Sequence, residues 1–217
     1  MTPDDFVRKW ESASQNERQG AHEHFIDLCR LLEIPTPNEA DPAGRTYCFE
    51  RSVAKTSGRP GRADVWKKDC FAWEYKSPGL DLGNAFTQLQ RYAPALGNPP
   101  LLIVSDLRRV RIHTNWTYVV STTIDIPAAE LLRPERRALL KAAFTDPDRL
   151  RPTRTRQALT AEAASRFAVL AARLERRGHA PEVVAHFLIR LVFCMAERHG
   201  HRPGRLRYLG RRFRGYG

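Results

Sequence analysis

Three charged residues, Asp64, Glu74 and Lys76, have the types and the spacing that metal-assisted hydrolysis needs. On a strand, Glu74 and Lys76 would share one face about 6.5 Å apart, because successive side chains alternate and each residue advances about 3.3 Å. The alternate positions, which would face the core, are aromatic: Phe71, Trp73 and Tyr75. Burying a carboxylate and an ammonium group in such a strand is unfavourable unless something uses them. Asp64, on the preceding arm of an expected hairpin, can lie across from Glu74.

This arrangement suits the hydrolysis of a phosphodiester. Two carboxylates can hold Mg²⁺, a hard cation that takes oxygen ligands and keeps several waters. The cation would polarise the scissile phosphate and lower the pKa of an attacking water. Lys76 would neutralise the charge that builds on the phosphoryl oxygens. The alternative interpretation is a surface hairpin with an ordinary ion pair, since short D…ExK matches arise by chance.

The elements that must position these residues are a hairpin and the helix after it. Residues 63–66 and 70–76 form the expected strands, and the glycines of the loop 58–61 would let the backbone approach a partner closely. The helix expected over residues 81–96 carries Gln88 and Tyr92 at i and i+4, so both could face the carboxylates. An amphipathic core helix would explain the same pair.

The rest of the chain predicts an α/β fold with a mixed sheet flanked by helices. Helical periodicity covers residues 3–12, 16–33, 134–144, 160–177 and 181–197, and further strands are expected over 47–50, 101–104, 110–113 and 118–124. The expected division is a nuclease domain over residues 1–150, the start of a helical spacer over 151–197, and an Arg/Gly-rich tail over 198–217. This tail is expected to be disordered or frameshifted.

The charge indicates a polyanionic partner. The net charge is +12, and seven arginines with no acidic residue follow Glu197. No apolar run is long enough to cross a membrane and no secretion signal is evident, so we expect a cytoplasmic protein without a membrane partner. The four cysteines lie in apolar stretches without CxxC spacing and are expected to be buried free thiols. Walker, GxSxG and HExxH motifs are absent from the sequence.

Taken together, the hairpin and the helix resemble the PD-(D/E)xK nuclease superfamily, including the QxxxY helix of its RecB-like branch. Over about residues 3–197 the chain resembles the N-terminal region of MmeI-like type IIL restriction–modification enzymes, most specifically in Phe71-Ala-Trp-Glu-Tyr-Lys76. The resemblance implies a restriction-endonuclease-like core and Mg²⁺-dependent cleavage of double-stranded DNA in phage defence. It implies Asp64 and Glu74 as metal ligands and Lys76 as the catalytic lysine. The implied supporting residues are Gln88, Tyr92 and, more weakly, Glu50.

Members of that family continue into a methyltransferase and a target recognition domain, which this sequence lacks. A separate methyltransferase or specificity chain is therefore a candidate partner, and self-association could serve double-strand cleavage. Two alternatives to a nuclease remain open: a catalytically silent DNA-binding or assembly module, and a truncated remnant of a fused enzyme. The remnant would expose an apolar patch on the helices expected over 160–177 and 181–197.

Overall fold

The computed structural model describes residues 1–12, 17–53 and 61–198. The chain divides into two compact units, Met1–Arg156 and Gln157–Gly217. The tail expected to be disordered therefore lies, except for its first residue, outside the described residues, as does most of the glycine-containing loop at 58–61.

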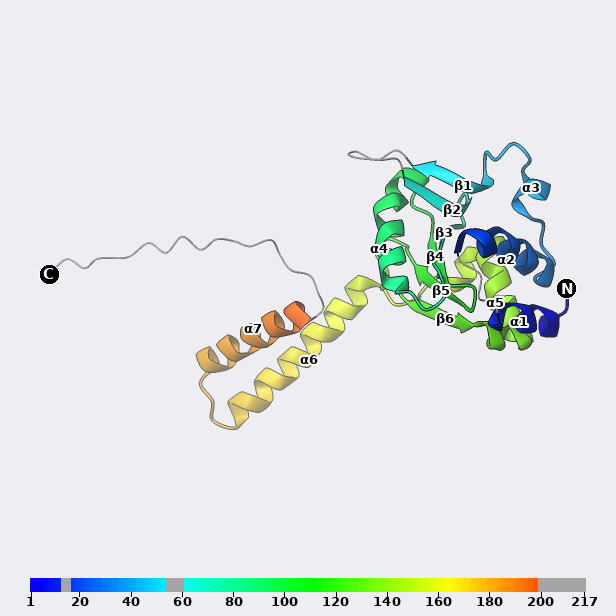
Figure 1. Ribbon diagram of the computed structural model, residues 1–217. Coiled ribbons are helices and arrows are strands. Elements are labelled where there is room, and N and C mark those ends of the chain that lie inside the picture. Colours follow the sequence, from blue (N-terminus) through cyan, green and yellow to red (C-terminus); the bar gives the residue numbers. More distant parts are fainter. Residues whose placement is uncertain (13–16, 54–60, 199–217) are drawn as a thin grey trace. The chain divides into compact units, whose positions relative to one another are not determined.

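The first unit is built on a six-stranded mixed sheet in the order β1-β2-β3-β4-β5-β6 (Figure 1). Its strands are β1 (Tyr47–Val53), β2 (Gly61–Lys67), β3 (Phe71–Tyr75), β4 (Leu101–Ser105), β5 (Arg109–Thr114) and β6 (Thr123–Pro127). All neighbours are antiparallel except β3 and β4, which run parallel. A parallel pair needs a crossover connection, and the helix α4 (Leu82–Tyr92) provides it. The expected α/β class and mixed sheet are thus present.

Helices cover both faces of the sheet, so β3 and β4 are buried throughout. One face packs on α1 (Pro3–Glu11), α2 (Glu17–Leu31) and α5 (Pro134–Thr145), and α4 lies over the other (Figure 1). Phe71, Trp73 and Tyr75 belong to the larger cluster, on the side of α1, α2 and α5. Ala72 belongs to the cluster beneath α4. The alternation expected along this strand is therefore confirmed.

Some element boundaries differ from the sequence-based expectations. The short helix α3 (Pro37–Ala40) was not among the expected helices, and it forms because Thr36 and Glu39 make a capping box. The strand expected over 118–124 is wrong in its first half: Tyr118 has a positive φ of 66°, and β6 begins only at Thr123. The helix expected to reach residue 96 ends at Tyr92, and residues Ala93–Leu96, which include Pro94, form a 3₁₀ turn.

The second unit contains the long helices α6 (Arg156–Arg176) and α7 (Pro181–Arg198), joined through Gly178 with a φ of +88°. Large apolar side chains are exposed on these helices, among them Val169, Val183, Phe187, Ile189, Val192 and Phe193. Apolar exposure of this kind is what the truncated-remnant alternative predicted for these helices. None of the described helices is both long and apolar enough to span a membrane.

The cysteines agree only in part with the expectation of buried free thiols. All four are free. Cys29 is buried, Cys48 and Cys70 are half-buried, and Cys194 is exposed on α7. Cys194 is exposed because the apolar side chains around it on α7 are themselves largely exposed.

Candidate active site

Glu74 is a buried carboxylate in the middle of the sheet. It pairs with Val104 of β4, and only 4% of the residue is exposed. Burying a carboxylate is unfavourable unless hydrogen bonds and positive charge compensate it. Two polar side chains do so at Oε1: Lys76 Nζ lies 3.0 Å away, and Gln88 Nε2 donates at 2.6 Å.

Lys76 is the first residue after β3, and its backbone is still held by the sheet. Its N–H donates to the carbonyl of Ser105 at 2.8 Å, which continues the parallel ladder with β4. Its side chain is 21% exposed, against 5% for the side chain of Glu74. The ammonium group therefore lies between the buried carboxylate and solvent, where it could meet an anionic substrate.

Asp64 lies where β2 and β3 separate. The backbone ladder between these strands covers Val65–Lys67 of β2 and ends at the pair Val65 and Trp73. One residue further on, the side chain of Asp64 replaces a backbone carbonyl, because its Oδ2 accepts the N–H of Tyr75 at 2.6 Å. Continuing the register by one residue places Asp64 beside Glu74. Asp64 is thus held beside the backbone of Tyr75, the residue that follows Glu74, on the elements that the sequence predicted.

A break in the side-chain alternation accompanies this opening. Val65 packs in the cluster on the side of α1 and α2, whereas Ala63, two residues earlier, packs under α4. Residues two apart on a regular strand point to the same face, so the alternation breaks at Asp64. On the neighbouring strand β1, Glu50 has a positive φ of 51° and is skipped in the pairing with β2. It lies between the pairs Phe49–Val65 and Arg51–Ala63, opposite Asp64.

Gln88 and Tyr92 lie one helical turn apart on α4 and contact different strands. Gln88 reaches the carboxylate on β3, as described above. Tyr92 is 7% exposed and packs on the backbone of β2: a Cβ at Gly61 would lie 2.4 Å from its Cζ. The expectation that both could face the carboxylates is therefore met directly by Gln88, while Tyr92 contacts the strand that carries Asp64. Gly61 is the only residue of the loop 58–61 among the described residues, and it packs against this ring, so the approach to a partner expected of the loop stays a prediction.

Glu50, the weakest of the expected site residues, faces away from these contacts. Its carboxylate accepts from Arg62 Nη1 at 2.6 Å, and both side chains are more than half exposed. It lies on β1, at the edge of the sheet. An edge-strand carboxylate in a surface ion pair describes Glu50 better than a site ligand does.

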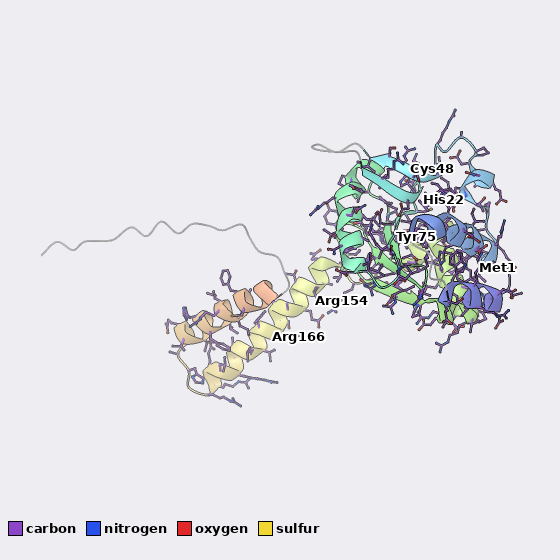
Figure 2. The ribbon with its side chains drawn as sticks, viewed as in Figure 1. Met1, His22, Cys48, Tyr75, Arg154 and Arg166 are labelled. Atoms are coloured by element: carbon purple, nitrogen blue, oxygen red, sulfur yellow. The ribbon has the colours of Figure 1, made fainter. Side chains whose placement is uncertain are left out.

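A buried network behind the site was missed from the sequence. His24 Nδ1 lies 2.8 Å from the hydroxyl of Tyr75, which Figure 2 labels within the sheet of the first unit. His24 also hydrogen-bonds the backbone of Leu107, and burial lowers its pKa to about 3, so its ring is neutral. Burial also raises the pKa of Tyr75 well above its usual value. The neutral His24 thus shares a hydrogen bond with the Tyr75 hydroxyl, which anchors the strand that carries Glu74.

The sequence offered only a weak signal for this network. His24 lies two residues from His22 in the helix α2. In the structure the two rings have different partners, because His22 stacks near Phe49 while His24 contacts Trp10 and Tyr75. His113 of β5 is half-buried and stacks on Phe86 of α4.

The donor set of the site fits a hard divalent cation. Asp64 and Glu74 offer carboxylate oxygens, whereas no group of three histidine, cysteine or acidic residues suited to a metal lies together in the described part of the chain. A site with two protein carboxylates is one that Mg²⁺ accepts, since it keeps several waters and binds substrate phosphate directly. A Zn²⁺ site would instead need three or four protein ligands.

Comparison with known proteins identifies the family. A family model described as MmeI, N-terminal domain, matches residues 1–177. No curated protein and no solved structure matches the chain. Because the match covers most of the chain, the chain belongs to the MmeI N-terminal domain family, which indicates a region of a restriction–modification enzyme.

Proposed function

We propose that the chain is the PD-(D/E)xK nuclease region of a restriction–modification enzyme and hydrolyses DNA phosphodiesters with Mg²⁺. The observation that carries this proposal is the buried Glu74 carboxylate in contact with Lys76, next to the point where β2 and β3 separate and Asp64 accepts the N–H of Tyr75. An ordinary surface ion pair does not explain it, because Glu74 is buried and is held by Gln88 as well as by Lys76. Membership of the MmeI N-terminal domain family supports the same class of protein.

In this proposal each side chain has a distinct role. Asp64 and Glu74 hold the cation, which when bound supplies Lewis-acid polarisation of the phosphate and a more acidic water. Gln88 orients the carboxylate of Glu74 through its amide donor. Lys76, partly exposed beside Glu74, faces the phosphoryl oxygens and stabilises the charge that develops on them in the transition state.

The proposed substrate is double-stranded DNA, as the net charge of +12 favours a polyanion. The proposed partners are a separate methyltransferase or specificity chain, and a second copy of the chain for cutting both strands. A type IIL role in phage defence and action in the cytoplasm belong to the same proposal.

The test compares two isosteric substitutions in one hairpin. Asp64→Asn removes a proposed ligand but keeps an oxygen that can accept the N–H of Tyr75. Asp69→Asn is the matched control, because Asp69 is exposed in the turn between the same strands and has a φ of +59°, which Asn tolerates. Cleavage of duplex DNA is measured with Mg²⁺, with Mn²⁺ and with EDTA.

We expect the wild type and Asp69→Asn to cut duplex DNA with Mg²⁺ and to stop in EDTA. Asp64→Asn should lose at least about 100-fold in rate, which corresponds to roughly 2.7 kcal/mol of transition-state stabilisation. Salt-sensitive DNA binding without cleavage by the wild type, even with Mn²⁺, would contradict the proposal and favour a silent binding module.

A further inference from the structure

The end of β2 that carries Asp64 has little backbone support from its inner neighbour. Its ladder with β3 stops at Val65, and one residue further on the Asp64 side chain accepts the N–H of Tyr75. On its other side β2 pairs with β1, an edge strand whose Glu50 interrupts the pairing opposite Asp64. The backbone pairing of β2 therefore does not by itself fix the position of Asp64 relative to Glu74.

The helix α4 offers a further constraint, since it contacts both strands of the opening. Gln88 donates to Glu74 on β3, and Tyr92, one turn later, packs on β2 at Gly61. The fit at Gly61 leaves no room for a side chain. An added Cβ would lie 2.4 Å from Cζ, 2.5 Å from Oη and 2.7 Å from Cε1 of the tyrosine ring.

We propose that Tyr92 is a positioning residue, which fixes β2 through Gly61 and thereby sets Asp64 against Tyr75 N–H and Glu74. Gly61 has a φ outside the left-handed region, so the close approach of the ring, and not a special backbone conformation, requires glycine there. Tyr92 is only 7% exposed, so its ring packs mainly against the protein. The effect on metal binding rests on the proposed function, whereas the effect on the Asp64–Tyr75 hydrogen bond does not.

The test enlarges the side chain at Gly61 and asks whether a smaller side chain at Tyr92 compensates. Gly61→Ala places a methyl group against the ring, so that β2 or the ring must move. Tyr92→Leu lacks all three colliding atoms and should accept the methyl group, whereas Tyr92→Phe keeps Cζ and Cε1 and should not. The set is therefore the wild type, the single variants, and the double variants Gly61→Ala/Tyr92→Leu and Gly61→Ala/Tyr92→Phe.

Two readouts are measured on the full chain. The first is hydrogen exchange of the Tyr75 amide without metal, which reports its bond to Asp64. We expect Gly61→Ala to speed this exchange at least tenfold, and Gly61→Ala/Tyr92→Leu to exchange no faster than Tyr92→Leu alone. Gly61→Ala/Tyr92→Phe should stay as fast as Gly61→Ala. The second readout is Mg²⁺ affinity by calorimetry, which should follow the same order, with at least a tenfold loss in Gly61→Ala.

A general loss of stability is controlled by Leu140→Ala, in the fully buried core on α5. It should lower Tm yet leave the Mg²⁺ affinity of the folded protein unchanged. Wild-type exchange at Tyr75 in Gly61→Ala, or purely additive effects of the two positions, would overturn the positioning role. If the wild type binds no divalent cation while the exchange results hold, the proposed function fails and the positioning of Asp64 stands.

Discussion

Replacing Gln88 by alanine should weaken both the folded state and the site. Gln88 Nε2 donates to Glu74 Oε1 at 2.6 Å, and the side chain of Glu74 is only 5% exposed. Water therefore cannot readily replace the lost donor. Hydrogen bonds to charged groups contribute about 1.5–3 kcal/mol, and leaving a buried acceptor short of a donor has a similar penalty.

That free energy sets the expected size of the effect. For a unit of this size, 1 kcal/mol corresponds to roughly 2–4 °C in Tm, so Gln88→Ala should lower Tm by roughly 3–12 °C. Gln90→Ala is the matched control, because it removes the same residue type from an exposed position of α4. It should change the free energy of unfolding by no more than about 0.5 kcal/mol.

The assay is urea denaturation of both variants, with and without Mg²⁺, followed by the rate of duplex cleavage. We expect Gln88→Ala to show a lower unfolding midpoint and cleavage at least about tenfold slower, as 1.4 kcal/mol is a tenfold change in rate. Equal unfolding midpoints for the two glutamine variants would show that the hydrogen bond from Gln88 to Glu74 contributes nothing to stability, and would contradict this prediction.

Three further predictions concern the surroundings of the site. Burial lowers the pKa of His24 to about 3, so the unfolded chain binds more protons below pH 6.5. Stability should therefore fall by up to about 1.4 kcal/mol per pH unit from His24 as the pH drops below 6.5, and His24→Gln should lessen that slope in urea denaturation. Glu50→Gln removes only an exposed ion pair with Arg62, so cleavage should stay within about twofold of the wild-type rate, and a hundredfold loss would restore Glu50 as a site residue. Phe144→Ala should lower the free energy of unfolding by about 3–5 kcal/mol, since the ring is buried against Phe25, Phe71 and Trp73, and a calorimetric Tm near that of the wild type would contradict this packing.

The elements around the site could be read from local pattern. Alternation along 71–76 separated the aromatic core positions from Glu74 and Lys76, and helical spacing placed Gln88 where it reaches Glu74. These features depend on periods of two and of about 3.6 residues, which a sequence displays directly.

Features set by long-range contacts could not be read in this way. The separation of β2 from β3 depends on the Asp64 side chain accepting a backbone N–H eleven residues away. The hydrogen bond between His24 and Tyr75 joins residues 51 apart, and no local pattern reports it. At Tyr118 the local pattern was misleading. The β-branched residues that follow it predicted a strand over 118–124, yet the positive φ of Tyr118 turns the chain there.

A structural ion pair would give Lys76 no part in DNA cleavage, whereas the proposed nuclease centre requires it. Removing Lys76 therefore gives the most direct test. Lys76→Ala is compared with Lys68→Ala, an exposed lysine in the turn of the same hairpin, in single-turnover cleavage of duplex DNA with Mg²⁺. We predict that both variants remain folded, that Lys68→Ala cuts at close to the wild-type rate, and that Lys76→Ala loses at least about 100-fold in rate. Wild-type cleavage by a folded Lys76→Ala protein would contradict the assignment of this site as a nuclease centre.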